Sequence, residues 1–133
     1  MLGKYFGTQI KESVFNQVDV ILPVPLHKSK LRKRGYNQSE WLAMGISESL
    51  NKPLDINSLL RTVATDTQTR KSRFDRWKNV EKIFNITEHK VLEGKHVLIV
   101  DDVVTTGSTL EACINAVLEV NNTKVSIATL AVA

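Results

Sequence analysis

One stretch of the chain, residues 97–109, constrains the fold more than any other. It reads VLIVDDVVTTGST: four aliphatic residues, two aspartates, then a turn rich in small hydroxyl side chains. Four consecutive aliphatic residues are typical of a strand that is buried on both faces of a parallel sheet. Ligands of such sheets bind beyond the carboxyl ends of the strands. We therefore predict that residues 97–101 form a central strand and that Asp101 and Asp102 lie at the ligand edge.

The turn that follows the two aspartates has the composition of a phosphate site. It would supply backbone N–H groups, small hydroxyls and a glycine at the start of a helix, an arrangement that binds a phosphate monoester. Its residues are Thr105, Thr106, Gly107, Ser108 and Thr109. Carboxylates repel phosphate, so the aspartates are placed instead to accept hydrogen bonds from sugar hydroxyls or to bind a divalent metal. Together these features indicate a ribose 5-phosphate site. The chain contains neither GxxxxGK[ST] nor GxGxxG, so this turn is not a Walker A loop or a dinucleotide fingerprint.

The hydropathy pattern of the remaining chain predicts alternating strands and helices. We expect strands at residues 18–24, 59–63, 96–100 and 125–132, extended chain at 84–86, and helices at 1–17, 38–51 and 109–120. The middle helix would be capped by Asn37 or Ser39. Its apolar residues are Trp41, Leu42, Ala43, Met44, Ile46 and Leu50. Residues 64–82 are polar and aperiodic, which is typical of a functional or mobile loop. This order predicts one α/β domain over residues 1–133, with a mainly parallel sheet flanked by helices.

Positive charge is concentrated in two segments. The whole chain has a net charge of +4, whereas residues 27–38 hold five basic residues and no acid, and residues 61–82 hold seven basic residues and three acids. Two such segments close together would attract a phosphate-rich ligand or nucleic acid. Aromatic residues make up only 6% of the chain, so stacking platforms for single-stranded DNA are few and strong DNA binding is not expected.

The composition argues against several classes of protein. The single cysteine, Cys113, can form neither an internal disulfide nor a four-cysteine zinc site, and within a helix it is expected in the core. No apolar run approaches the roughly 20 residues that a membrane span needs. The first residues lack the apolar segment of a secretory signal. We therefore expect a soluble cytoplasmic protein that binds no zinc.

Residues 97–109 resemble the phosphoribosyl pyrophosphate motif of type I phosphoribosyltransferases. A second similarity is to the ComF subgroup of that superfamily, which contains competence-related proteins. It rests on residues 23–38 (PVPLHKSKLRKRGYNQ), Gln68, Arg76, Asn79, Val80 and Phe84. ComF-type proteins usually begin with a cysteine-rich, zinc-binding segment, which this sequence lacks, so we expect either a piece of a longer protein or a zinc-free form.

The resemblance implies a type I phosphoribosyltransferase fold in which a mobile hood loop, here residues 64–82, closes over the site. It implies that Asp101 and Asp102 contact the ribose 2′ and 3′ hydroxyls and Mg²⁺, and that residues 105–109 hold the 5-phosphate. The pyrophosphate loop would be Leu26, His27 and Lys28. The candidates in the hood and basic loop are Arg32, Arg34, Gln68, Arg73 and Arg76, with Arg76 as the catalytic candidate. Tyr36, Asn37 and Gln38 are expected to position the basic loop.

Three functions fit these features. An active enzyme would use Mg²⁺ and phosphoribosyl pyrophosphate, transfer the phosphoribosyl group to a nitrogen acceptor and release pyrophosphate. A ligand sensor would bind phosphoribosyl pyrophosphate or a ribose phosphate without turnover. An accessory protein in DNA uptake would act with competence or DNA-processing proteins. The sequence leaves the oligomeric state open, including a homo-oligomer.

Overall fold

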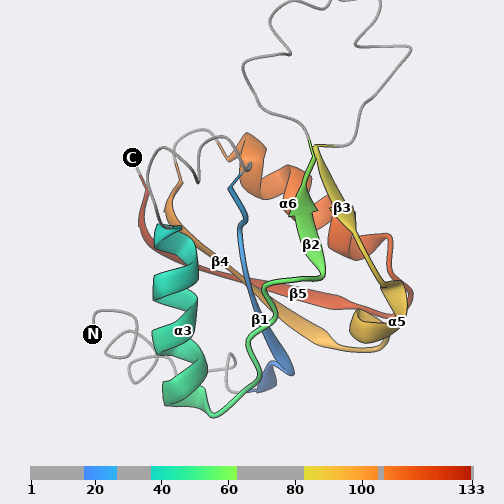
Figure 1. Cartoon of the computed structure of the whole chain (residues 1–133), viewed down its shortest axis with the longest axis horizontal. Helices are drawn as coiled ribbons and strands as arrows, with labels where there is room; N and C mark the ends of the chain where they lie inside the picture. Colours follow the sequence, from blue (N-terminus) through green and yellow to red (C-terminus); the bar gives the residue numbers. More distant parts are fainter. Residues whose placement is uncertain (1–16, 27–36, 63–82, 105–106, 133) are drawn as a thin grey trace, which may run out of the picture.

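The central sheet of the molecule is parallel, and the described residues contribute three strands to it. The computed structural model describes residues 17–26, 37–62, 83–104 and 107–132. Strand β4 (His96–Val104) lies between β1 (Val20–Pro23) and β5 (Lys124–Val132), and both neighbours run parallel to it (Figure 1). The predictions of a mainly parallel α/β fold and of a central strand at residues 97–101 are confirmed.

Helices cover both faces of this sheet. Helix α3 (Gln38–Leu50) packs on one face and α6 (Ser108–Leu118) packs on the other. The short helix α5 (His89–Leu92) precedes β4 and was not predicted. One helical turn is too short to show a hydrophobic period, which explains why the pattern gave no sign of it.

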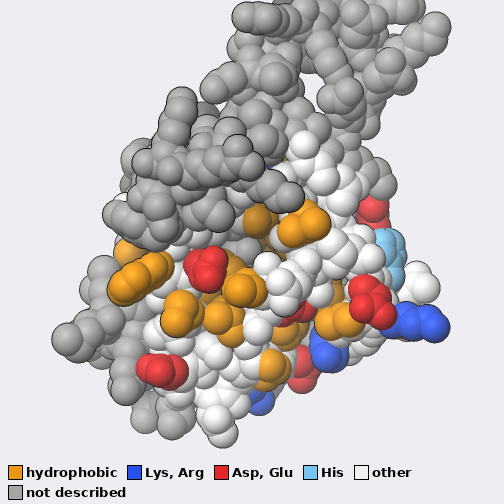
Figure 2. Space-filling view, viewed as in Figure 1, with side chains coloured by type: hydrophobic (Ala, Val, Ile, Leu, Met, Phe, Trp, Pro, Cys, Tyr) orange, Lys and Arg blue, Asp and Glu red, His pale blue; other side chains and the backbone are white. Residues whose placement is uncertain are grey.

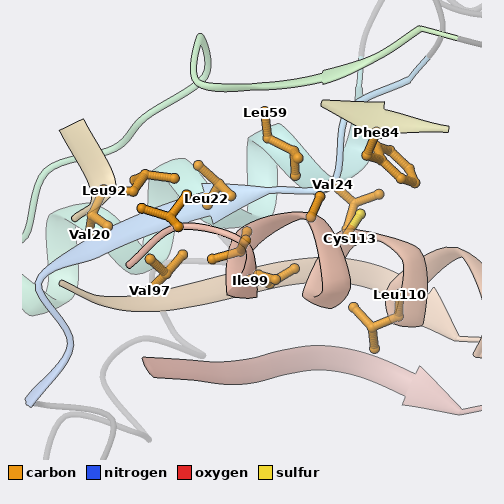
Figure 3. Packing of buried hydrophobic residues seen from close by; sticks show 13 residues of the cluster. Val20, Leu22, Val24, Leu59, Phe84, Leu92, Val97, Ile99, Leu110 and Cys113 are labelled. Carbon is orange, nitrogen blue, oxygen red and sulfur yellow. The ribbon is translucent and has the colours of Figure 1, made fainter. Parts of the chain in front are cut away.

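The side chains of β4 alternate between two hydrophobic clusters. In the run 97–100, the first and third residues pack with Cys113 of α6, and the second and fourth pack with Ile46 of α3. Figure 3 shows the first cluster, which β1 and the ring of Phe84 also enter. All four aliphatic residues of the run have 0% exposure, so the strand is buried on both faces as predicted. Full burial of such a side chain stabilises the fold by roughly 1.5–3 kcal/mol.

A two-stranded antiparallel ribbon lies outside the main sheet. It consists of β2 (Leu59–Arg61) and β3 (Phe84–Ile86). The sequence predicts extended chain at both places, and the structure shows that the two segments pair with each other. The free edge of β1 is instead met by the chain that follows α3. There the Ile21 N–H donates to Pro53 O, and the Asp55 N–H donates to Ile21 O, both at 2.9 Å.

Helix α3 begins and ends where the sequence predicts, but its buried face is narrower. Asn37 is the N-cap residue, and Asn51 ends the helix in the left-handed conformation, with φ 55°. Of the predicted apolar side chains, Trp41 is 69% exposed and Met44 is 50% exposed. A helix that packs on one face of a sheet buries a single stripe, and these two residues lie beside that stripe.

The remaining boundaries differ from the prediction in one place that affects the site. Strand β4 does not end at Val100; it continues through both aspartates to Val104, because β5 pairs with it as far as Val132. The other late elements, α6 and β5, agree with the predicted helix and strand to within two residues. The predicted helix at 1–17 falls almost wholly outside the described residues, as does the hood at 64–82. Within the described segments, no helix is both long and apolar enough to cross a membrane.

Candidate functional site

Two adjacent aspartates stand in the carboxyl-terminal half of the central strand. Asp101 is in register with Thr129 of β5, and Thr129 Oγ1 donates to the backbone oxygen of Asp102 at 3.3 Å. On the other side of β4, the Val24 N–H donates to Val100 O at 2.9 Å. The sequence predicted the acid pair just beyond the strand, whereas the structure has it within the strand. Strand β5 therefore pairs with the backbone at the acid pair, and the residue that follows β1 bonds to the residue just before the pair.

Ser39, in the first turn of α3, meets both aspartates. Its Oγ lies 3.2 Å from Asp101 Oδ1 and 3.4 Å from Asp102 Oδ1, and the Asp102 N–H donates to the same Oγ at 3.3 Å. A hydroxyl carries one proton, so it donates to one carboxyl oxygen at a time while it accepts from the backbone. Ser39 itself is buried, with 4% exposure. The start of α3 is thereby joined to the end of β4.

Asn37 joins the start of α3 to the chain just after β1. Its Oδ1 accepts from the Ser39 N–H at 3.0 Å, which caps the helix, and its Nδ2 donates to Val24 O at 3.1 Å. An N-cap amide satisfies a helix N–H that would otherwise lack a partner. The ends of the chain segment that carries the first basic run are therefore held together beside the acid pair. The loop that Asn37 is predicted to position, residues 27–36, lies outside the described residues, so the prediction stays open.

Burial changes the proton affinity of the acid pair. Loss of solvent, together with a hydrogen bond and charge repulsion from the neighbouring Asp102, raises the pKa of Asp101 to about 6, against the opposing effect of the Ser39 hydroxyl. Loss of water disfavours the charged form of a carboxyl group, and a second acid beside it acts in the same direction. A carboxyl with such a raised pKa beside a second acid is typical of functional sites.

Helix α6 begins at a glycine in the left-handed backbone conformation. Gly107 is the N-cap residue with φ +82°, and the Glu111 N–H donates to its oxygen at 2.8 Å. Positive φ is readily adopted only by glycine. Among the residues that the structure describes, none has an atom within 4 Å of a methyl group placed at Gly107. Ser108 is exposed and Thr109 is half-buried in the same first turn.

The structure describes part of the predicted set of site residues. Asp101, Asp102 and residues 107–109 come from β4 and the start of α6, and Leu26 is half-buried just after β1. The other predicted residues lie outside the described segments. They are Thr105, Thr106, His27, Lys28, Arg32, Arg34, Gln68, Arg73 and Arg76.

The sequence reasoning missed Ser39, which contacts the acid pair, and Arg61, which packs on Phe84. Ser39 was considered only as a helix cap. Its partners, Asp101 and Asp102, lie 62 and 63 positions further along the chain, so no local sequence pattern signals the contact. Arg61 was counted only as one of the basic residues. Its guanidinium carbon lies 5.5 Å from the ring centre of Phe84. Burial raises the pKa of the Cys113 thiol to about 12, and the charge of Asp101 adds to this effect. The charge of Arg61 acts in the opposite direction, so the charges of Asp101 and Arg61 both influence the core around Cys113.

The acid pair offers two oxygen ligands of the kind that Mg²⁺ prefers. Among the residues that the structure describes, no cluster of three or more His, Cys, Asp or Glu side chains forms a complete metal site. Protein-bound Mg²⁺ usually takes one or two carboxylates and completes its shell with water and substrate phosphates. Asp101 and Asp102 therefore fit a magnesium ion that arrives with a phosphorylated ligand.

The chain is similar in sequence to several named bacterial proteins. The chain is 40% identical over 92 residues to DNA utilization protein YhgH of Escherichia coli strain K12, a match that covers 69% of this chain and 40% of that protein. It is 39% identical over 93 residues to competence protein F of Haemophilus influenzae, over 69% of this chain and 41% of that protein. The matched region spans about 40% of the length of these relatives.

Two solved structures share the fold. One is the glutamine phosphoribosylpyrophosphate amidotransferase from B. subtilis complexed with ADP and GMP, with TM-score 0.67 and 22% identity over 97% of this chain and 26% of that chain. The other is a purine phosphoribosyltransferase from Pyrococcus horikoshii Ot3, with TM-score 0.61 and 24% identity over 98% of this chain and 70% of that chain. The sequence pattern described as the phosphoribosyl transferase domain matches residues 9–132. The chain therefore belongs to the phosphoribosyl transferase domain family.

Proposed function

We propose that this domain binds the ribose 5-phosphate part of phosphoribosyl pyrophosphate at the carboxyl end of β4. Asp101 and Asp102 accept hydrogen bonds from the ribose 2′ and 3′ hydroxyls. Residues 105–109 hold the 5-phosphate through backbone N–H groups at the start of α6. The observation that carries the proposal is the spacing of these two parts. The acid pair on the central strand is followed within five residues by a left-handed glycine, and no described residue lies within 4 Å of the point where its Cβ would be.

The ends of the two basic segments support a pyrophosphate site at the same edge. Val24 and Asn37 are joined by a 3.1 Å hydrogen bond, and the Thr62 N–H donates to Ile83 O at 2.9 Å. In Figure 1 both junctions lie toward the end of the molecule where α6 begins. The segments between them carry the arginines and lysines proposed to face pyrophosphate: Lys28, Arg32, Arg34, Arg73 and Arg76.

The proposed reaction moves the phosphoribosyl group to a nitrogen acceptor. The nitrogen forms a bond to ribose C1 while the bond from C1 to the pyrophosphate oxygen breaks. Pyrophosphate leaves with the bonding electrons, and the nitrogen loses a proton. The main task of the protein is to hold and orient the two reactants. When bound with the substrate, Mg²⁺ would neutralise charge that develops on the leaving pyrophosphate.

The family match over residues 9–132 supports two further parts of the proposal. The 133 residues act as one domain, with residues 1–17 as an extension and residues 64–82 as the hood. The protein acts as an enzyme of the pentosyltransferase class.

A pyrophosphate-release assay tests the proposal. The protein is mixed with phosphoribosyl pyrophosphate, Mg²⁺ and a panel of acceptors that includes ammonium, primary amines and nucleobases. We expect acceptor-dependent release of pyrophosphate, reduced about tenfold or more in Asp102→Asn because a group that orients the ribose is lost. Asp55→Asn is the matched control, since Asp55 is a hydrogen-bonded aspartate outside the site.

Binding of ribose 5-phosphate, measured by calorimetry, separates the remaining outcomes. Binding without pyrophosphate release by any acceptor would favour the ligand sensor over the enzyme. The absence of both binding and release would overturn the proposed site.

The names of the relatives favour a second function. The matched proteins of E. coli and H. influenzae are described by DNA utilization and competence. An accessory role in DNA uptake is compatible with a phosphoribosyl site, because the ligand could regulate contact with a DNA-processing partner.

A further inference from the structure

We propose that Ser39 is a positioning residue that holds the Asp101–Asp102 pair in the arrangement that receives ribose. This inference rests on the proposed function and extends its site to α3, an element outside the phosphoribosyl pyrophosphate motif. Ser39 comes from the first turn of α3, whereas the acid pair belongs to β4. The three polar contacts between them, at 3.2, 3.3 and 3.4 Å, all meet at one oxygen atom.

The geometry explains why a hydroxyl is needed at this point. Adjacent residues of a strand normally point to opposite faces of the sheet. Here one oxygen of each carboxyl group nevertheless lies within 3.4 Å of the same Ser39 Oγ. Two carboxylates that converge repel each other, and a hydroxyl proton between them offsets part of that repulsion. The bond from the Asp102 N–H fixes the position of the hydroxyl oxygen and so the point at which the two side chains meet.

The hydroxyl itself is held in place by the cap of the helix. Asn37 accepts from the Ser39 N–H and donates to the carbonyl at the end of β1, and both Asn37 and Ser39 are buried. A buried side chain with fixed backbone partners can orient its neighbours, because it has few alternative positions. The ends of β1 and α3 therefore determine where Ser39 Oγ lies relative to β4.

The chain contains a matched control for this role. Ser58 is also 4% exposed and donates to an aspartate, with Ser58 Oγ 2.6 Å from Asp55 Oδ2. That pair precedes β2 and belongs to the turn in which Asp55 accepts from the Asn57 and Ser58 N–H groups. Ser39→Ala and Ser58→Ala each remove a buried serine hydroxyl bonded to an aspartate, but only Ser39 lies in the proposed site.

The first measurement needs no ligand. Carboxyl carbon resonances of the aspartates are recorded by NMR at a fixed pH of 8 in the wild type and both variants. We expect Ser39→Ala to move the Asp101 and Asp102 resonances and leave that of Asp55 in place. Ser58→Ala should do the reverse. If Ser39→Ala leaves the acid pair unchanged, Ser39 does not hold it and the inference is wrong.

The second measurement is the affinity for ribose 5-phosphate. Loss of one hydrogen bond to a charged group predicts that Ser39→Ala weakens binding about tenfold. Ser58→Ala should bind as the wild type does, even if its melting temperature falls by as much as that of Ser39→Ala. Ser39→Thr keeps the hydroxyl and should restore part of the affinity. Equal affinity of Ser39→Ala and the wild type would overturn the role in ligand binding.

The two measurements separate this inference from the proposed function. If the wild type neither binds ribose 5-phosphate nor releases pyrophosphate, the proposed function is wrong and the inference on Ser39 fails with it. If the wild type binds it and Ser39→Ala binds equally well, the proposed function stands and the inference on Ser39 fails.

Discussion

Asp101 occupies a position that lowers the stability of the fold at neutral pH. Burial raises its pKa to about 6 from the ordinary value of 3.8. Between these two values the folded chain binds more protons than the unfolded chain. The free energy of unfolding therefore falls as the pH rises from about 4 to about 6, and the loss is complete above that range. An acid kept at such a position is consistent with a role in ligand binding rather than in folding.

Replacement of this carboxyl group should stabilise the protein. We expect Asp101→Asn to raise the free energy of unfolding at pH 8 by about 1 kcal/mol, a value that allows for solvent screening of the half-buried group. The gain should shrink as the pH falls from 6 toward 4, where the wild-type carboxyl becomes neutral. Urea unfolding at several pH values measures it.

Asp55 provides a control of opposite sign. Burial acts to raise the pKa of Asp55, but hydrogen bonds from Ser58 and from the Asn57 and Ser58 backbone, together with Lys95, lower it overall. Such a group contributes stability above its unfolded pKa, and that stability is lost as the pH falls through the folded pKa. Asp55→Asn should therefore destabilise the protein at pH 8. A loss of stability in both variants at that pH would contradict the argument for Asp101.

At the scale of elements, helix α6 begins at a glycine that supplies a left-handed backbone conformation and leaves room for the proposed phosphate. Gly107 has φ +82°, and Gly94, in the turn before β4, has φ +74°; within the described part of the chain, a methyl group at either position meets no atom within 4 Å. Alanine at either glycine should lower the free energy of unfolding by about 1 kcal/mol through backbone strain. Only Gly107→Ala should also weaken ribose 5-phosphate binding, because its methyl group would enter the proposed phosphate space. Calorimetry on both variants checks this, and an equal loss of affinity in both would argue against a phosphate site at α6.

The elements with strong local signals could be predicted from the sequence. The aliphatic run gave the central strand, and the asparagines at 37 and 51 gave the ends of α3. Strand β4 extends through two aspartates against their low strand propensity, because pairing with β5 provides backbone partners. The acid pair could be found from its motif, whereas the Ser39 contact depends on how α3 packs against the sheet. No local pattern in the sequence encodes that contact.

For the whole molecule, the order of the strands explains why the site forms at one edge. Because β1, β4 and β5 are parallel, their carboxyl ends meet, and the chain leaves that edge toward α3 and α6. The sequence order of strands and helices predicted the parallel sheet, but not that β2 and β3 would form a separate ribbon. That pairing joins residues on either side of the predicted hood. Such a long-range pairing is determined by the packing of Phe84 on the α6 face, which no local pattern reveals.

The distribution of charge over the whole molecule favours a compact anion over DNA. The described residues include five lysines and arginines and ten aspartates and glutamates, so they are net acidic. On the face shown in Figure 2, the Lys and Arg side chains that are plainly visible lie in the lower and right-hand part of the picture, away from the end where α6 begins. Most of the basic residues instead belong to the two segments whose ends are joined at Val24–Asn37 and at Thr62–Ile83. DNA binding requires many phosphate contacts spread along a surface.

We therefore expect weak DNA binding that uses the same basic side chains as the small ligand. At about 150 mM salt, the dissociation constant for a DNA duplex should fall in the non-specific range, about 1–100 µM, and weaken further with added salt. Phosphoribosyl pyrophosphate with Mg²⁺ should displace the DNA, because both ligands would use the arginines and lysines of residues 27–38 and 61–82. Fluorescence anisotropy with a labelled duplex measures both effects, and Mg²⁺ with inorganic sulfate controls for ionic strength. Submicromolar DNA binding that is unchanged by saturating phosphoribosyl pyrophosphate would show that the DNA surface is separate from the proposed site, and it would favour the accessory role in DNA uptake.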